Sequence, residues 1–169
     1  MGRMKTLTAG LVLAAAVIAS AAQMPKYGVT VTVDKKVDFA TFKTYSWTKG
    51  QPSALKQVDA EIMAAVDHEL AGVGMTKAAA GPGDVMVAYY SLTRTDVDVN
   101  GKEDASGKRP QYQVGTLMVA FLDPASRARL VRMRIDKPIT ESDSAKLKPE
   151  IDEAVAEIFA KYPTRTEKK

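Results

Sequence analysis

The stretch DVDVNG, residues 96–101, is where the chain comes closest to a metal-binding pattern. Its alternating oxygen-bearing side chains match the first half of an EF-hand calcium loop, namely Asp96, Asp98, Asn100 and Gly101. The second half does not match, because Gly107 stands where a bidentate glutamate is required. Asn-Gly is also the preferred centre of a tight hairpin turn, since both residues accept a positive φ. The sequence therefore favours a hairpin turn or a mobile polar loop here, with a weak cation site as the alternative.

A second candidate is the arginine series in SRARLVRMRIDK, residues 126–137. Alternation along a strand directs Leu130, Arg132 and Arg134 to one side, opposite the apolar residues at 131, 133 and 135. Arg132 and Arg134 could then bind an anion, such as a polyanionic envelope component, on an open sheet face. The alternative is a solvated face whose arginine stems cover apolar neighbours. The sequence favours this alternative, because charge rows on strands are typical of exposed faces.

The remaining inventory of reactive groups is sparse. The chain contains one histidine, His68, and no cysteine, so we expect no zinc, copper or haem site and no cofactor. No G-x-S-x-G motif accompanies His68, and helical spacing directs that side chain to solvent. The glycines of GPG, residues 81–83, lack the lysine and helix start that would hold a phosphate. Paired carboxylates are left, and because no spacing singles out a pair, the sequence leans away from an enzyme.

Four aromatic residues gather in one segment: Phe39, Phe42, Tyr45 and Trp47. On an exposed face they could form a platform for carbohydrate or peptide. Packing in the core and at the edge of a strand is the alternative. We favour packing, because the chain has few other large side chains with which to fill a core.

The first 22 residues have the order of a secretory signal peptide. Arg3 and Lys5 give a positive start, an uncharged apolar run follows at 11–19, and small residues lead to Ala22. We expect cleavage after Ala22, or one residue earlier, and hence a periplasmic or secreted protein. Retention of the segment as a membrane anchor is the alternative, although the apolar run is short for a span. With no cysteine near the cleavage point we expect no lipid anchor, and the net charge of +4 gives no reason to expect nucleic acid.

Hydrophobic periodicity predicts a single α+β domain over residues 23–163, followed by a charged flexible tail at 164–169. Period-two alternation predicts strands over 29–33, 42–47, 85–95, 115–123 and 129–136. Helical spacing predicts helices over 55–73 and 147–158; Gly72 and Gly74 would end the first, and Pro163 the second. The order β-β-α-β-β-β-α predicts one mostly antiparallel sheet of about five strands with both helices packed on one face.

Three segments, taken in order, resemble the domain of unknown function 4136 family of exported bacterial envelope proteins. The segment VDFATFKTYSW carries the family's opening motif, here Asp38, Phe39, Lys43, Thr44, Tyr45 and Trp47. VAYY (87–90) is similar to the strand after the family's first helix, and DEAVAEIFAKYP (152–163) to its terminal helix. The resemblance covers nearly all of the chain after the signal segment, and it implies an α+β fold and an envelope location.

The resemblance implies no functional residue, because no activity is established for that family. Its members are commonly lipoproteins, whereas this chain lacks the cysteine that would carry the lipid. Arg132, Met133 and Arg134 stand where the family tends to Trp-Arg-Gly, so a function tied to that tryptophan is not carried over.

The predicted function is that of a non-catalytic binding or assembly module of the cell envelope, with an unknown envelope protein or ligand as its partner. Binding would use the open sheet face or the 96–110 loop. The alternative is a carboxylate-dependent hydrolase acting on envelope material, whose signature would be two carboxylates about 5 to 9.5 Å apart in a cleft.

Overall fold

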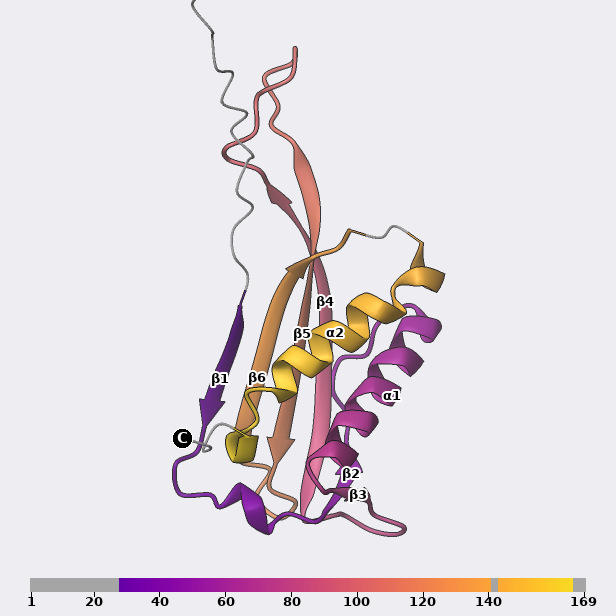
Figure 1. The fold of residues 1–169 in the computed structure, drawn as a ribbon, viewed down its shortest axis with the longest axis vertical. Coiled ribbons are helices and arrows are strands. Elements are labelled where there is room, and N and C mark those ends of the chain that lie inside the picture. Colours follow the sequence, from indigo (N-terminus) through magenta and orange to yellow (C-terminus); the bar gives the residue numbers. More distant parts are fainter. Residues whose placement is uncertain (1–27, 141–142, 166–169) are drawn as a thin grey trace, which may run out of the picture.

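A computed structural model describes residues 28–140 and 143–165, which form one sheet with two helices on one of its faces (Figure 1). The predicted signal segment and residues 166–169 of the predicted tail lie outside the described residues. The strands are β1 (Val29–Val33), β2 (Thr44–Trp47), β3 (Thr76–Lys77), β4 (Val85–Val97), β5 (Gln111–Leu122) and β6 (Arg129–Pro138). The helices are α1 (Lys56–Gly72) and α2 (Lys148–Phe159), with 3-10 turns η1 (Phe39–Thr41), η2 (Ser144–Lys146) and η3 (Pro163–Arg165).

The sheet has six strands in the order β1-β6-β5-β4-β2-β3, and it is mixed rather than mostly antiparallel. β2 pairs in parallel with both β4 and β3, whereas the other neighbours pair antiparallel. The parallel pairing follows from α1, because a helix between two strands returns the chain to the end from which the first strand started. The prediction of about five strands missed β3, whose two residues are too few to show a period.

Both helices form where the periodicity predicts them, and both bury their apolar stripes against the same sheet face. Val66 and Leu70 of α1 are fully buried, as are Val155 and Ile158 of α2. Gly74 has a φ of +86°, the left-handed conformation that ends a helix at low cost for glycine. The core is one cluster that joins these helices to alternate residues of the strands.

Two aspartates tie α1 to aromatic side chains of the sheet. Asp67 accepts hydrogen bonds from the Tyr45 hydroxyl at 2.7 Å and from Trp47 Nε1 at 2.8 Å. Asp59 accepts one from the Tyr89 hydroxyl, and burial together with this bond raises the pKa of Tyr89 to about 12. The polar groups of Tyr45, Trp47 and Tyr89 thus have their partners at the edge of the helix, where a carboxylate stays partly solvated.

The aromatic segment belongs to the core, as packing rather than as a platform. Phe39 and Tyr45 are buried, while Phe42 and Trp47 are partly buried and pack against the same cluster. Phe42 lies just before β2, so that strand is two residues shorter than predicted.

A β-bulge between β5 and β6 corrects the predicted facing of Leu130. Phe121 is opposite Val131, whereas Leu122 is opposite Arg129, so Leu130 is the extra residue. Leu130 therefore turns into the helix-side core instead of sharing a face with Arg132. The bulge also puts Arg129 on the same open face as Arg132, because Arg129 lies opposite Leu122, which is on that face.

The β4–β5 hairpin projects beyond the rest of the sheet (Figure 1). β4 and β5 stay paired as far as Val97 and Gln111, whereas β6 ends opposite Val114. The predicted hairpin is present, but its turn is not a tight Asn-Gly turn. Neither Asn100 nor Gly101 is among the residues with positive φ, and the connection runs from 98 to 110.

In the described part of the chain, no helix has the length and apolarity needed to cross a membrane. Arg165, which the sequence analysis assigns to the flexible tail, lies in η3. Its guanidinium forms an ion pair with Glu69 of α1, with Nη1 and Oε2 2.8 Å apart. The folded domain therefore continues two residues beyond Pro163.

We predict that Gly83→Ala destabilises the fold by about 1–3 kcal/mol, the usual effect of overpacking. A Cβ at residue 83 would lie 2.6 Å from the Tyr45 Cα, on backbone that cannot move without disturbing β2. Gly28→Ala is the matched control, because no atom lies within 4 Å of the added Cβ. Urea denaturation of both variants tests this, and equal midpoints would contradict it.

Candidate functional site

A groove of about 670 Å³ lies between the amino-terminal halves of both helices and the sheet. Its volume falls within the range of about 300–1,000 Å³ that is typical of small-molecule sites. The helices contribute mainly apolar residues: Leu55, Val58, Ile62, Leu147, Ile151 and Ala154. The strands contribute Ser91, Thr93, Gln113, Gly115, Leu117 and Ile135, among others, and Ile139 follows β6 directly.

The groove exists because the amino-terminal ends of both helices stop short of the hairpin end of the long strands, so part of the sheet there is not covered. Most lining residues of β4, β5 and β6 are alternate residues that point to the helix side of the sheet, at the end from which the hairpin projects. Toward the other end of the same strands, Val87, Phe121 and Val131 are fully covered.

The groove offers apolar surface to a ligand. Leu55, the residue before α1, is 54% exposed at its rim, although a leucine is normally buried. Gly115 adds no side chain to the floor, and a Cβ at this position would come into ordinary contact with Ile139. Covering such surface contributes about 0.8 kcal/mol per buried methylene group.

Polar groups at the rim are engaged with one another. Lys137 is the cation among the lining residues, and its Nζ lies 2.6 Å from Glu157 Oε1 and 3.3 Å from Glu153 Oε1. Burial alone would lower the pKa of Lys137, but the hydrogen bonds to Glu157 and Glu153 outweigh it and raise that pKa. Glu150 accepts a hydrogen bond from the Thr140 hydroxyl. The described rim is therefore polar, and its lysine is already paired.

The predicted anion-binding residues Arg132 and Arg134 lie on the opposite, uncovered face of the sheet. Arg134 is paired with Asp136, with Nη2 and Oδ1 2.9 Å apart. The Arg132 guanidinium makes no hydrogen bond or ion pair with any described residue, although the residue is half-buried. Arg134 is thus already paired with a carboxylate, whereas Arg132 is not. Anion binding by these arginines stays a prediction.

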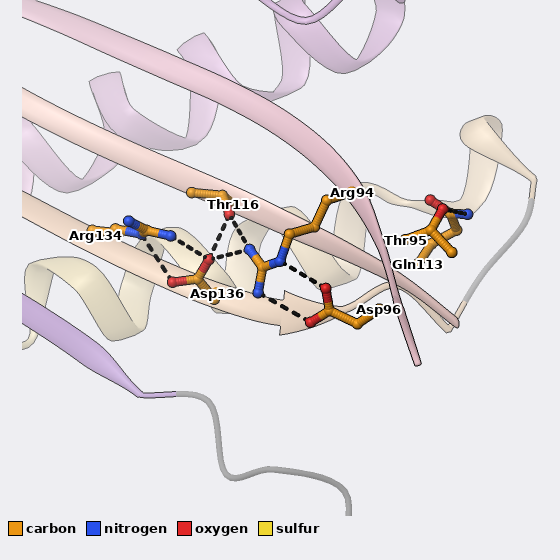
Figure 2. A network of polar contacts seen from close by, with 7 residues as sticks. All are labelled: Arg94, Thr95, Asp96, Gln113, Thr116, Arg134 and Asp136. Atoms are coloured by element: carbon orange, nitrogen blue, oxygen red, sulfur yellow. Dashed lines mark hydrogen bonds and ion pairs between the residues drawn. The ribbon is translucent and has the colours of Figure 1, made fainter. Parts of the chain in front are cut away.

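Figure 2 shows a network that joins three strands on this face. Arg94 of β4 reaches across β5 to Asp136 of β6, with Nη1 and Oδ1 2.8 Å apart, and it also pairs with Asp96. The buried Thr116 hydroxyl lies between them and donates to Asp136. Burial would raise the pKa of Asp136, but hydrogen bonds from Arg134, Thr116 and Arg94 hold it far below its usual range. The network fixes the root of the projecting hairpin.

The predicted cation ligands Asp96 and Asp98 bind different groups of the protein. Asp96 belongs to the arginine network, while the Asp98 carboxylate accepts the backbone N–H of Asn100 at 3.0 Å. Over residues 28–140 and 143–165, no group of three or more His, Cys, Asp or Glu side chains is placed to hold a metal ion. His68 is exposed on α1, as predicted.

Sequence reasoning missed the groove and the role of Arg94. The groove residues come from both helices and three strands, and each has an ordinary place in its own pattern. Arg94 of β4 and Asp136 of β6 fall on the same face of the sheet, but this is evident only once the strand register is known. That register is not readable from either strand alone.

Comparisons with known proteins identify a family and a fold. The family model described as Domain of unknown function (DUF4136) matches residues 29–164. A crystal structure of a PDZ domain protein from Parabacteroides distasonis is similar, with a TM-score of 0.55 and 18% identity. That match covers 81% of this chain but only 35% of the other, so the chain spans about a third of that protein.

A structure of the PelC dodecamer from Paraburkholderia phytofirmans is also similar, with a TM-score of 0.52 and 8% identity. Here the match covers 80% of this chain and 96% of the other. At these identities the likeness shows the fold alone. No curated protein matches the chain.

We predict that Asp136→Asn lowers the free energy of unfolding by about 2 kcal/mol at pH 7, because it weakens hydrogen bonds to charged groups. The folded-state pKa of Asp136 is depressed, so its stabilisation is full above the unfolded pKa of about 3.9 and is lost as the pH falls. The difference from wild type should therefore shrink between pH 5 and pH 2 in urea denaturation.

The control for this prediction is Asp152→Asn, which removes an exposed ion pair with Lys148 and should change stability by less than about 0.5 kcal/mol. A difference between wild type and Asp136→Asn that stays constant down to pH 2 would show that the carboxylate charge does not matter.

Proposed function

The chain belongs to the DUF4136 family, and from that premise we propose that it is a non-catalytic binding module of the cell envelope whose site is the apolar groove. The single observation that supports this is a groove of about 670 Å³ with apolar walls on ordered elements.

The occupant that the groove fits is the hydrocarbon tail of a single-chain amphiphile. The walls from α1 and α2 and the floor at Leu117 and Ile135 are apolar, so they would cover methylene groups. Hydroxyl and amide side chains at Thr93 and Gln113 stand at the edge, where a polar head would meet water. The open groove allows the head to remain solvated.

The head that fits best is uncharged or zwitterionic. Lys137 is already held by Glu153 and Glu157, so it is not free to pair with an anionic head. Glu150 and Glu153 would also repel an anion brought to the same rim. An ammonium group in a zwitterion would instead meet these carboxylates.

Hydrolysis by carboxylates is supported less well than binding. Both carboxylates that line the groove are engaged, Glu150 by Thr140 and Glu153 by Lys137. A glycoside hydrolase uses one carboxyl group to protonate the leaving group and a second as base or nucleophile, whereas each carboxylate here is already bound to a neighbouring side chain.

Assembly is a second candidate role. The similar PelC structure is described as a dodecamer, and its chain is covered over nearly its whole length by this fold. A scaffold of this shape is therefore compatible with a multimer, and light scattering of the purified protein distinguishes assembly from ligand binding by a monomer.

We predict that Thr93→Trp lowers the affinity for lysophosphatidylcholine at least tenfold, because the indole would fill the groove from its sheet side. Thr93 is exposed and lines the groove, so the change removes no core contact. Calorimetric titration below the critical micelle concentration measures the binding. Lysophosphatidylglycerol, with the same tail and an anionic head, should bind more weakly to the wild type.

The control is Lys49→Trp, which adds the same side chain at an exposed position away from the lining residues. It should bind like the wild type. Equal loss in both variants, or no binding by the wild type, would remove the groove as a lipid site.

We also propose that the protein is exported and works in the periplasm or outside the cell. The order of charge, apolar run and small residues before Ala22 supports this. Mass spectrometry of protein from the periplasmic fraction should show a chain that begins at Gln23, or one residue earlier. Recovery of the intact chain from the cytosol would contradict export.

A further inference from the structure

The two edges of the sheet are protected to different degrees. β3 forms one edge and is blunted, because it has two residues and one of them is Lys77. β1 forms the other edge with the sequence VTVTV, which has no charge, no proline and no bulge against β6. No described residue pairs with its outer side. Natural sheets rarely leave such an edge unprotected unless another strand covers it.

The phase of the β1–β6 ladder shows which backbone groups of β1 point outward. Asp34 N–H donates to the Leu130 carbonyl at 2.8 Å, in the same register that pairs Thr32 with Arg132. Because hydrogen-bonded residues alternate along an antiparallel strand, Thr30 and Thr32 also point their backbone groups toward β6. The N–H and C=O groups of Val29, Val31 and Val33 therefore point away from the sheet.

The sequence of β1 is the same in both directions, which makes the strand complementary to itself. We propose that β1 of one copy pairs antiparallel with β1 of a second copy, centred on Val31, so that two sheets join into one. In this register each valine faces a valine, and Thr30 faces Thr32 of the second copy. The two-fold symmetry closes the interface, so the product is a dimer rather than a fibre.

The surroundings of β1 permit this pairing. The valine side chains point to the helix side, where Val29 and Val31 already pack against the core. Thr30 and Thr32 point to the uncovered face and are exposed. Gly28, which would face Asp34 of the second copy, has no atom within 4 Å of the place of a Cβ. The interface does not use the groove, so its failure and that of lipid binding are separate outcomes.

Disulfide cross-linking tests the register directly, because the chain has no cysteine of its own. Thr30→Cys and Thr32→Cys are made as two single variants and oxidised separately and as a mixture. Thr30 and the facing Thr32 would form a non-hydrogen-bonded pair with Cα atoms about 4.5 Å apart, which a disulfide can bridge. Each variant would face its own kind only across a diagonal of about 7–8 Å.

The expected result is a cross-linked dimer in the mixture, at a yield at least several times that of either variant alone. No dimer in the mixture, or equal yields in all three samples, would overturn the proposal. Circular dichroism of each variant confirms that the fold is intact.

A charge variant provides a second test, read by sedimentation equilibrium. Thr30→Glu with Thr32→Glu places carboxylates beside Arg134 and Arg132 of β6, so the single chain should not be weakened. Across the proposed interface each glutamate would face a glutamate, and the dimer Kd should rise at least threefold. Ala60→Glu with Ala64→Glu adds the same charge on exposed positions of α1 and should leave Kd unchanged. Equal effects of the two pairs, or a monomeric wild type at high concentration, would sink the proposal.

Discussion

The structure depends on a mismatch of length between its strands and the helices that cover them. A strand rises about 3.3 Å per residue and a helix 1.5 Å, so the 13 residues of β4 span about 43 Å, whereas the 17 residues of α1 span about 26 Å. The 12 residues of α2 span about 18 Å. Two short helices cannot cover such strands from end to end. The apolar side that they leave open becomes the groove, and beyond it β4 and β5 continue as a projecting hairpin (Figure 1).

Polar side chains are placed where this cover stops. Asp59 and Asp67 bind the hydroxyl and indole groups of the sheet along the margin of α1, and Lys137 binds two glutamates of α2 at the groove rim. At the root of the hairpin, where no helix packs, the Arg94 network joins β4 to β6 across β5 (Figure 2). Charged hydrogen bonds hold the strands together there, as apolar packing does under the helices. This division explains why a carboxylate as strongly stabilised as Asp136 lies on an uncovered face.

The features with a proposed role occupy separate parts of the same scaffold. The groove lies on the helix side at one end of the sheet, while the β1 edge lies beside β6 with its free backbone groups directed away from both helices. Joining two sheets through β1 would leave each groove open. Binding and association would then be compatible in one molecule. The uncharged edge strand and the exposed Leu55 are both departures from ordinary protective design, and the occupant proposed for each would explain it.

The sequence by itself determined both helices, five of the six strands, the packing of the aromatic segment and the family, because these depend on local periodicity, punctuation and short motifs. It also determined that histidine and cysteine chemistry is nearly absent. Only the tertiary structure decided the parallel pairing of β2 with β4, the turn of Leu130 into the core, the groove and the pairing of Arg94 with Asp136. Each of these joins residues that are distant in the chain, or rests on a strand register that shifts at a bulge. Register is set by how all the strands and helices pack together, so no single segment contains it.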